Sequence, residues 1–233
     1  MNLSLGLPIL LGWLAALLVN YLADVLPAAR KLRSPVCTDC TATTAWTDFL
    51  LLKPCSACGK RRSWRTWITQ FVGVAASLYI WLSPPPALGF WLGWVLLIYL
   101  GIVFIIDLEH RLVLHLTSYV GAALTLLIGV QIHGLKTSLL GGAAGFGIMF
   151  ALYYLGILFA RWMSKRRGET VIEEGDALGF GDVNLAGILG LLLGFPLIIG
   201  GILTAILAKR YEAFAAIPYA PFLILGAIWA LYF

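Results

Sequence analysis

Long uncharged apolar runs separated by short polar segments dominate the pattern of this chain. The runs cover about residues 5–26, 67–83, 87–106, 116–132, 138–160, 183–208 and 216–232. Runs of this length and polarity are typical of membrane-spanning helices. The pattern therefore predicts an all-α polytopic membrane protein.

Two proline-containing segments bear on the number of spans. Three consecutive prolines in Ser83-Pro84-Pro85-Pro86 cannot lie inside a helix, so they predict a turn between two spans. Gly194-Phe195-Pro196 interrupts the run 183–208. That run is either one helix kinked at Pro196 or a hairpin of two short helices. The hairpin gives about eight short transmembrane helices.

The distribution of basic residues favours the hairpin. With eight spans, every Lys and Arg except Lys136 lies on one side of the membrane. A single kinked helix would move Lys209 and Arg210 to the other side. Because basic residues concentrate in cytoplasmic loops, the hairpin topology places both termini outside. The polar segments 28–66 and 161–181 then face the cytoplasm.

Composition excludes several protein classes. Hydrophobic residues make up 61% of the 233 residues and charged residues 12%. These values exclude a disordered chain, a secreted disulfide miniprotein and an ordinary cytosolic enzyme. The net charge of +5 is explained by topology, so we do not expect a nucleic-acid partner. The expected partner is the lipid bilayer; the oligomeric state stays open.

The four cysteines form a spaced pair of motifs in the segment 28–66. Cys37, Cys40, Cys55 and Cys58 follow the pattern C-x2-C-x14-C-x2-C. Two such motifs can complete a tetrahedral metal site, so we expect structural Zn²⁺ in a small zinc-ribbon-like insert. Disulfides or reduced thiols without a role are the alternatives, and a reducing cytoplasm disfavours disulfides. The expected division is a first helix (1–27), a cytoplasmic four-cysteine zinc-binding domain (28–66) and a membrane-embedded domain (67–233).

Two aspartates lie at span ends on the same expected face. Asp107 ends one span, and Asp182 begins another within Gly179-Phe180-Gly181-Asp182. Separately, Asp182 could be a helix N-cap and Asp107 an interfacial charge. Together they predict a carboxyl pair that shares one proton, activates water and protonates a leaving amide. Gly179 and Gly181 would let the backbone turn tightly and a substrate strand approach.

These motifs, taken in order, resemble the type IV prepilin leader peptidases. The matching segments are Leu32-Arg33-Ser34-Pro35, the paired C-x2-C motifs, Ile106-Asp107, Ala177-Leu178-Gly179-Phe180-Gly181-Asp182-Val183 and Ile217-Pro218-Tyr219-Ala220-Pro221-Phe222-Leu223. The resemblance implies a membrane aspartic peptidase of the bacterial inner membrane, with Asp107 and Asp182 as catalytic residues. It implies cleavage of prepilin or pseudopilin leaders at the cytoplasmic face. Many members also N-methylate the product with S-adenosylmethionine.

Two other function classes stay open beside the peptidase. A transporter or channel would also use membrane-edge acids and glycine-rich helices, but its acids usually lie near mid-membrane. A non-catalytic zinc-ribbon membrane adaptor would need the cysteines and not the aspartates. Cleavage of a prepilin by the purified protein distinguishes the peptidase from both.

Overall fold

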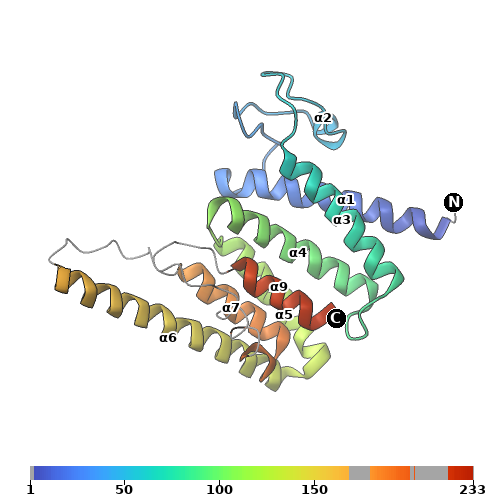
Figure 1. Cartoon of the computed structure of the whole chain (residues 1–233). Coiled ribbons are helices and arrows are strands. Elements are labelled where there is room, and N and C mark those ends of the chain that lie inside the picture. The colour runs from blue at the N-terminus through green and yellow to red at the C-terminus, as the bar shows by residue number, and fades with distance from the viewer. Residues whose placement is uncertain (1–2, 168–178, 200–201, 203–219, 233) are drawn as a thin grey trace. The chain divides into compact units, whose positions relative to one another are not determined.

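The structure, a computed structural model, describes residues 3–167, 179–199, 202 and 220–232 (Figure 1). The chain divides into two compact units, Met1–Ile106 and Asp107–Phe233. All regular elements among the described residues are helices, and an isolated β-bridge joins Val36 to Thr43. This confirms the predicted all-α class.

Eight helices are described. They are α1 (Leu3–Ala29), α2 (Trp46–Leu50), α3 (Trp64–Leu82), α4 (Gly89–His110), α5 (His115–His133), α6 (Leu135–Arg167), α7 (Phe180–Leu193) and α9 (Ala220–Tyr232). Among the described residues, α1, α4, α5 and α6 each contain a segment long and apolar enough to cross a membrane, while α7 and α9 are shorter apolar helices. A multi-pass membrane protein is therefore confirmed, and eight spans stay a prediction.

The helix boundaries follow the turn residues of the sequence. The predicted proline turn separates α3 from α4. α7 ends at Leu193 because Gly194 adopts a left-handed conformation with φ of 69°. The next N–H, that of Phe195, leaves the helix and donates to the Thr137 carbonyl at 3.2 Å. The run 183–208 is therefore not one continuous helix, and residues 203–208 lie outside the described part.

Two helices extend further into polar sequence than expected. α4 continues past Asp107 to His110, where Arg111 (φ 51°) ends it by donating its N–H to the Asp107 carbonyl at 2.8 Å. α6 continues to Arg167, into the expected 161–181 loop. Neither extension contains Gly or Pro. Once a helix has formed, extending it through such residues costs little free energy, whatever their charge.

Small residues let α1 and α3 approach each other closely in the first unit. A Cβ atom on Gly12 would stand 2.8 Å from the Gly73 carbonyl oxygen, and one on Gly73 would stand 2.8 Å from the Ala16 Cβ atom. Ser77 donates its hydroxyl to the Pro8 carbonyl at 2.8 Å. These contacts set α1 and α3 antiparallel, with backbone against backbone.

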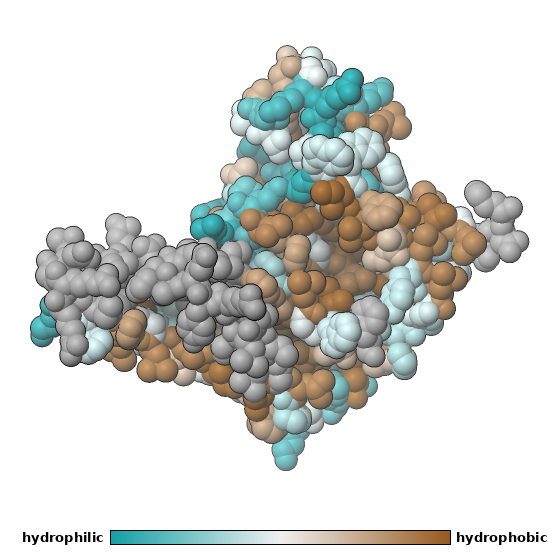
Figure 2. All heavy atoms as spheres, in the orientation of Figure 1, coloured by the Kyte–Doolittle hydropathy of each residue, from teal (hydrophilic) through white to brown (hydrophobic). Residues whose placement is uncertain are grey.

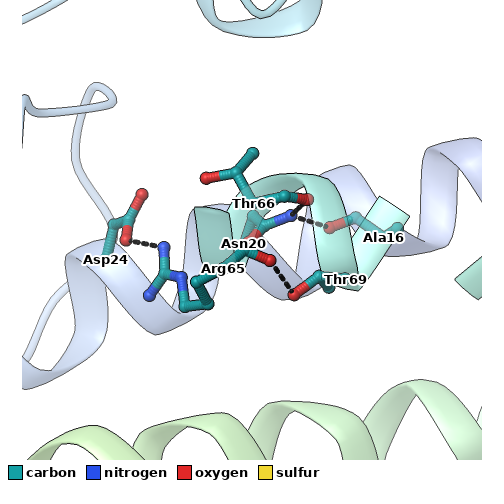
Figure 3. A network of polar contacts seen from close by, with 6 residues as sticks. All are labelled: Ala16, Asn20, Asp24, Arg65, Thr66 and Thr69. Carbon is teal, nitrogen blue, oxygen red and sulfur yellow. Dashed lines mark hydrogen bonds and ion pairs between the residues drawn. The ribbon is translucent and has the colours of Figure 1, made fainter. Parts of the chain in front are cut away.

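The same helix pair becomes polar toward the end of α1 (Figure 3). Arg65 of α3 forms an ion pair with Asp24 of α1, and both side chains are largely buried. Asn20 donates to the Ala16 carbonyl at 3.0 Å and to the Thr66 carbonyl at 3.5 Å. These bonds continue the α1–α3 contact into the first turn of α3.

Glycines also bring α6 and α7 together in the second unit. A Cβ atom on Gly141 would stand 2.3 Å from the Gly190 carbonyl oxygen, and one on Gly190 would stand 2.2 Å from that of Gly141. α5 joins the same contact, since a Cβ atom on Gly129 would stand 2.0 Å from the Leu191 carbonyl oxygen. α7 is therefore the buried centre of this unit, packed against α5, α6 and α9.

We expect the Asp24–Arg65 pair to stabilise the first unit. Asp24→Ala or Arg65→Ala leaves one buried charge without its partner, which costs about 3–5 kcal/mol. The double variant should lose less than the sum of the two. Unfolding of the full chain in mixed micelles measures these losses.

The exposed Lys53–Asp48 pair, 3.6 Å apart, is the matched control. Its loss in Lys53→Ala should cost below about 1 kcal/mol. Equal losses for the two pairs would contradict a stabilising role for Asp24 and Arg65.

Candidate active site and metal centre

Asp107 lies in the last turn of α4 and is only 3% exposed. Its Oδ2 atom has no hydrogen-bond partner among the described residues. A buried polar atom without a partner is costly, so it persists where the surroundings hold it in place. The Asp107 carboxyl group is therefore buried, and its Oδ2 atom is not held by a hydrogen bond to any described residue.

Asp182 lies in the first turn of α7 and is 8% exposed. The N-cap of α7 is Gly179, which makes no side-chain cap, and the Asp182 N–H donates to the Gly179 carbonyl at 3.0 Å. The interpretation of Asp182 as the N-cap is therefore wrong. A carboxylate at this position still lies in the favourable field of the helix N-terminus.

Gly181 packs against the segment that follows Asp107. A Cβ atom at position 181 would stand 2.8 Å from the Cβ atom of Val113. Val113 lies in the connection 111–114 between α4 and α5. The start of α7, with Asp182, therefore lies against the connection that begins one turn after Asp107.

The tight turn expected at the two glycines is not present. Gly179 has φ of −73° and ψ of 140°, and Gly181 lies within helix α7. The absent side chain matters at Gly181 because of the close approach to Val113. At Gly179 the nearest atoms to an added Cβ would be 4.0 Å away, and one of them is Oδ2 of Asp182. The space beside that carboxylate is therefore open as far as the described residues extend.

The two C-x2-C motifs fold into matching knuckles. The N–H of Thr41 donates to the Cys37 carbonyl at 3.0 Å, and that of Gly59 donates to the Cys55 carbonyl at 2.8 Å. Thr41 and Gly59 both adopt left-handed backbone, with φ of 57° and 71°. Glycine adopts this backbone without strain at position 59, whereas at position 41 a β-branched residue bears the strain.

The four cysteine sulfurs converge from the two knuckles. All lie within 4.8 Å of one another, with 3.8 Å between Cys37 and Cys58 and 3.7 Å between Cys40 and Cys55. Zn–S bonds of about 2.3 Å imply sulfur separations of about 3.8 Å in a tetrahedron. A disulfide needs about 2.05 Å, and the four cysteines are free. The cluster therefore fits a metal ion rather than disulfides.

The thiols of the cluster differ in acidity. Backbone N–H groups of Cys58 and Ala57 lower the pKa of Cys55 to about 6. The Ala42 N–H favours the Cys40 thiolate, but the Cys58 side chain and burial outweigh it and raise the pKa of Cys40 to about 12. One thiolate thus forms readily, whereas four together repel each other. A bound cation would remove that repulsion.

Sequence reasoning missed a second set of buried polar groups, between α1 and α3. Gln70 is 1% exposed, and neither atom of its amide has a hydrogen-bond partner among the described residues. The Asn20 Oδ1 atom is in the same state. The four-residue spacing of Asn20 and Asp24 within an apolar run was the available signal, since it places both on one helix face.

Comparison with known proteins identifies the family of the second unit. A family model described as "Type IV leader peptidase family" matches residues 94–232, more than half of the chain. No curated protein and no solved structure matches. The matched range includes Asp107 and Asp182 and excludes the cysteines. It also includes the segment 217–223, of which residues 217–219 lie outside the described part.

The left-handed residues of the knuckles should affect metal binding. Gly59→Val forces a β-branched residue into left-handed backbone at a cost of about 1–2 kcal/mol, or roughly a tenfold loss of Zn²⁺ affinity. Thr41→Gly should have the opposite sign. Competition with a chelator measures both on the full chain, and equal affinities would contradict the strain at Thr41.

Gly181 and Gly179 should respond differently to a methyl group. Gly181→Ala clashes with Val113 and should destabilise the protein by about 1–3 kcal/mol. Gly179→Ala places a methyl group no nearer than 4.0 Å to any described atom, so it should cost below about 1 kcal/mol. Unfolding in mixed micelles compares the two, and equal costs would show that the approach to Val113 is not tight.

Proposed function

The chain belongs to the type IV leader peptidase family, and on this premise we propose that it is a membrane aspartic endopeptidase with Asp107 and Asp182 as its catalytic pair. Its proposed substrates are type IV prepilins or pseudopilins, from which it removes the leader peptide. The family assignment supports the class of substrate. The two buried carboxyl groups support peptide hydrolysis by an aspartate pair.

The contact of Gly181 with Val113 is the observation that most supports this pair. It ties the first turn of α7 to the connection after α4, so both aspartates lie in chain segments that meet in the second unit. Both side chains are buried. Burial makes it costly for two nearby carboxyl groups to ionise together, which favours one shared proton.

Peptide hydrolysis needs both protonation states of such a pair. The ionised carboxylate takes a proton from water as the water oxygen bonds to the scissile carbonyl carbon. The protonated carboxyl group stabilises the carbonyl oxygen. When the C–N bond breaks, the amide nitrogen leaves with a proton returned by the carboxyl pair. The products are a leader that ends in a carboxyl group and a shortened pilin with a free amine.

Gly179 supports the route by which a substrate strand reaches the pair. Among the described residues, its missing side chain leaves open space beside Oδ2 of Asp182. An extended substrate backbone needs such room next to the carboxyl group that acts on it. We assign Gly179 to the substrate-binding loop and Gly181 to positioning of α7.

We place the active site at the cytoplasmic face of the bacterial inner membrane. The support is that in the eight-span topology every Lys and Arg except Lys136 falls on the same side of the membrane as Asp107 and Asp182. This distribution also supports a hairpin between 183 and 208. The termination of α7 at Gly194 agrees with a hairpin.

The cysteine cluster is proposed to hold structural Zn²⁺ through Cys37, Cys40, Cys55 and Cys58. Its tetrahedral sulfur spacing supports this choice of ion. Nothing among the described residues supports a site for S-adenosylmethionine. The proposal is therefore confined to cleavage, and N-methylation rests on the sequence resemblance alone.

Removal of either carboxylate should abolish cleavage. Asp107→Asn and Asp182→Asn each lose one partner of the proton transfer, so we expect cleavage slower by roughly 10²-fold or more. Leader removal from a prepilin, followed with the purified full chain in liposomes, measures this.

Glu109→Gln is the matched control, because Glu109 is exposed two residues after Asp107. It should cleave at the normal rate. Normal cleavage by either aspartate variant would disprove the pair. Absence of cleavage by the unaltered protein, with solute flux in the same liposomes, would favour the transporter. Mass spectrometry of the product also reports whether a methyl group is added.

A further inference from the structure

The segment between α1 and α3, residues 30–63, is here called the cysteine insert. Its helix α2 packs along the side of α1 rather than beyond its end. Phe49 of α2 and Leu52, just after the end of α2, are buried against Leu17, Tyr21 and Val25 of α1. The Tyr21 ring lies 6.1 Å from that of Phe49. Part of the insert therefore lies level with residues that the hydropathy of α1 assigns to a membrane span.

The register between α1 and α3 indicates where the membrane surface crosses α1. The sequence predicts that α3 crosses the membrane, and its 19 residues span about 28 Å, close to the thickness of a hydrocarbon core. Arg65, in its first turn, pairs with Asp24 of α1. Charged groups mark the edge of the hydrocarbon, so that edge lies near Asp24. Tyr21 lies within one turn of Asp24 and contacts α2. We therefore infer that α2 lies at the level of the lipid headgroups.

The outward face of α2 is apolar and has no cover in the described structure. Phe49 points inward. The Trp46 ring lies 5.1 Å from that of Tyr21 and is still half exposed, as is Leu50, and Leu51 is 66% exposed. Trp64, at the start of α3, is 83% exposed. Figure 2 shows hydrophobic side chains at the surface of this unit next to hydrophilic ones. Tryptophan and leucine at headgroup depth gain free energy from partial burial in lipid.

The charge of the insert complements phosphate headgroups. The insert has seven basic and two acidic residues. Both acids are paired, Asp39 with Lys60 and Asp48 with Lys53. Arg62 lies 5.0 Å over the inward-facing Phe49 ring, with its Nε and Nη2 atoms buried, whereas Arg61 is exposed. The insert therefore carries an excess of positive charge beyond its two ion pairs.

We propose that Trp46, Leu50 and Leu51 form an interfacial anchor that enters the headgroup layer of an anionic membrane leaflet, with the exposed Arg61 against lipid phosphates. The occupant of this face is lipid, because the face lies at headgroup depth and because its neighbours are basic. The cysteine insert is then a module resting on the bilayer, held by α1 on one side and by lipid on another.

Fluorescence quenching on the full chain in nanodiscs tests the anchor. An environment-sensitive fluorescent amino acid is encoded at position 51 or, as a matched control, at position 38, where Thr38 is exposed in the first knuckle. The discs contain phosphatidylglycerol with brominated acyl chains. We expect several-fold stronger quenching at position 51 than at position 38. Equal quenching at the two positions overturns the proposal.

Hydrogen exchange provides a second readout without changing the anchor residues. Amides of residues 46–52 should exchange several-fold more slowly in phosphatidylglycerol discs than in phosphatidylcholine discs, and Arg61→Gln should reduce that difference. Lys136→Gln, outside the insert, should leave it unchanged. The same exchange in both lipids overturns the role of headgroup charge, even if quenching at position 51 persists.

Discussion

Backbone-to-backbone contact between helices is the interaction on which the rest of this structure depends. Inside a bilayer, apolar side chains gain little by leaving lipid for protein, so helices associate through close packing and hydrogen bonds. The reciprocal contact of Gly141 with Gly190 places α7 at the centre of its unit. Gly181, at the start of α7, allows a similarly close approach, there mainly to the Val113 side chain. The position of Asp182 is therefore a consequence of helix packing.

Buried aspartates have different surroundings in the two units. In the first unit, Asp24 is matched by Arg65, so a buried charge contributes to the helix pair. In the second, Asp107 is buried with Oδ2 unmatched among the described residues. Unmatched buried carboxyl groups cost stability, and proteins keep them where reactivity requires it. The contrast agrees with a structural use of Asp24 and with the chemical use that we propose for Asp107.

The sequence was most informative where a residue type leaves few options. Three prolines between α3 and α4 predicted a turn, and four cysteines in two close pairs predicted a cluster, because neither pattern has many alternatives. It was least informative where partners distant in sequence decide the outcome. Position 181 needs glycine because Val113 approaches it closely, and Asp24 is buried because it pairs with Arg65. Neither partner can be read from the local sequence pattern. The extension of α6 was missed because charge was taken as the end of a helix, although helix propensity does not stop at the membrane surface.

The neighbouring residues Asn20 and Tyr21 give α1 two separate attachments. Asn20 bonds toward α3, and Tyr21 packs against α2 while its hydroxyl donates to the Arg33 carbonyl at 2.6 Å. The aromatic attachment is independent of the sulfur cluster, which lies at other residues of the insert. Loss of the proposed Zn²⁺ would therefore loosen the knuckles while α2 stays packed against α1. Metal loss and detachment of the insert would then be two events with separate free energies.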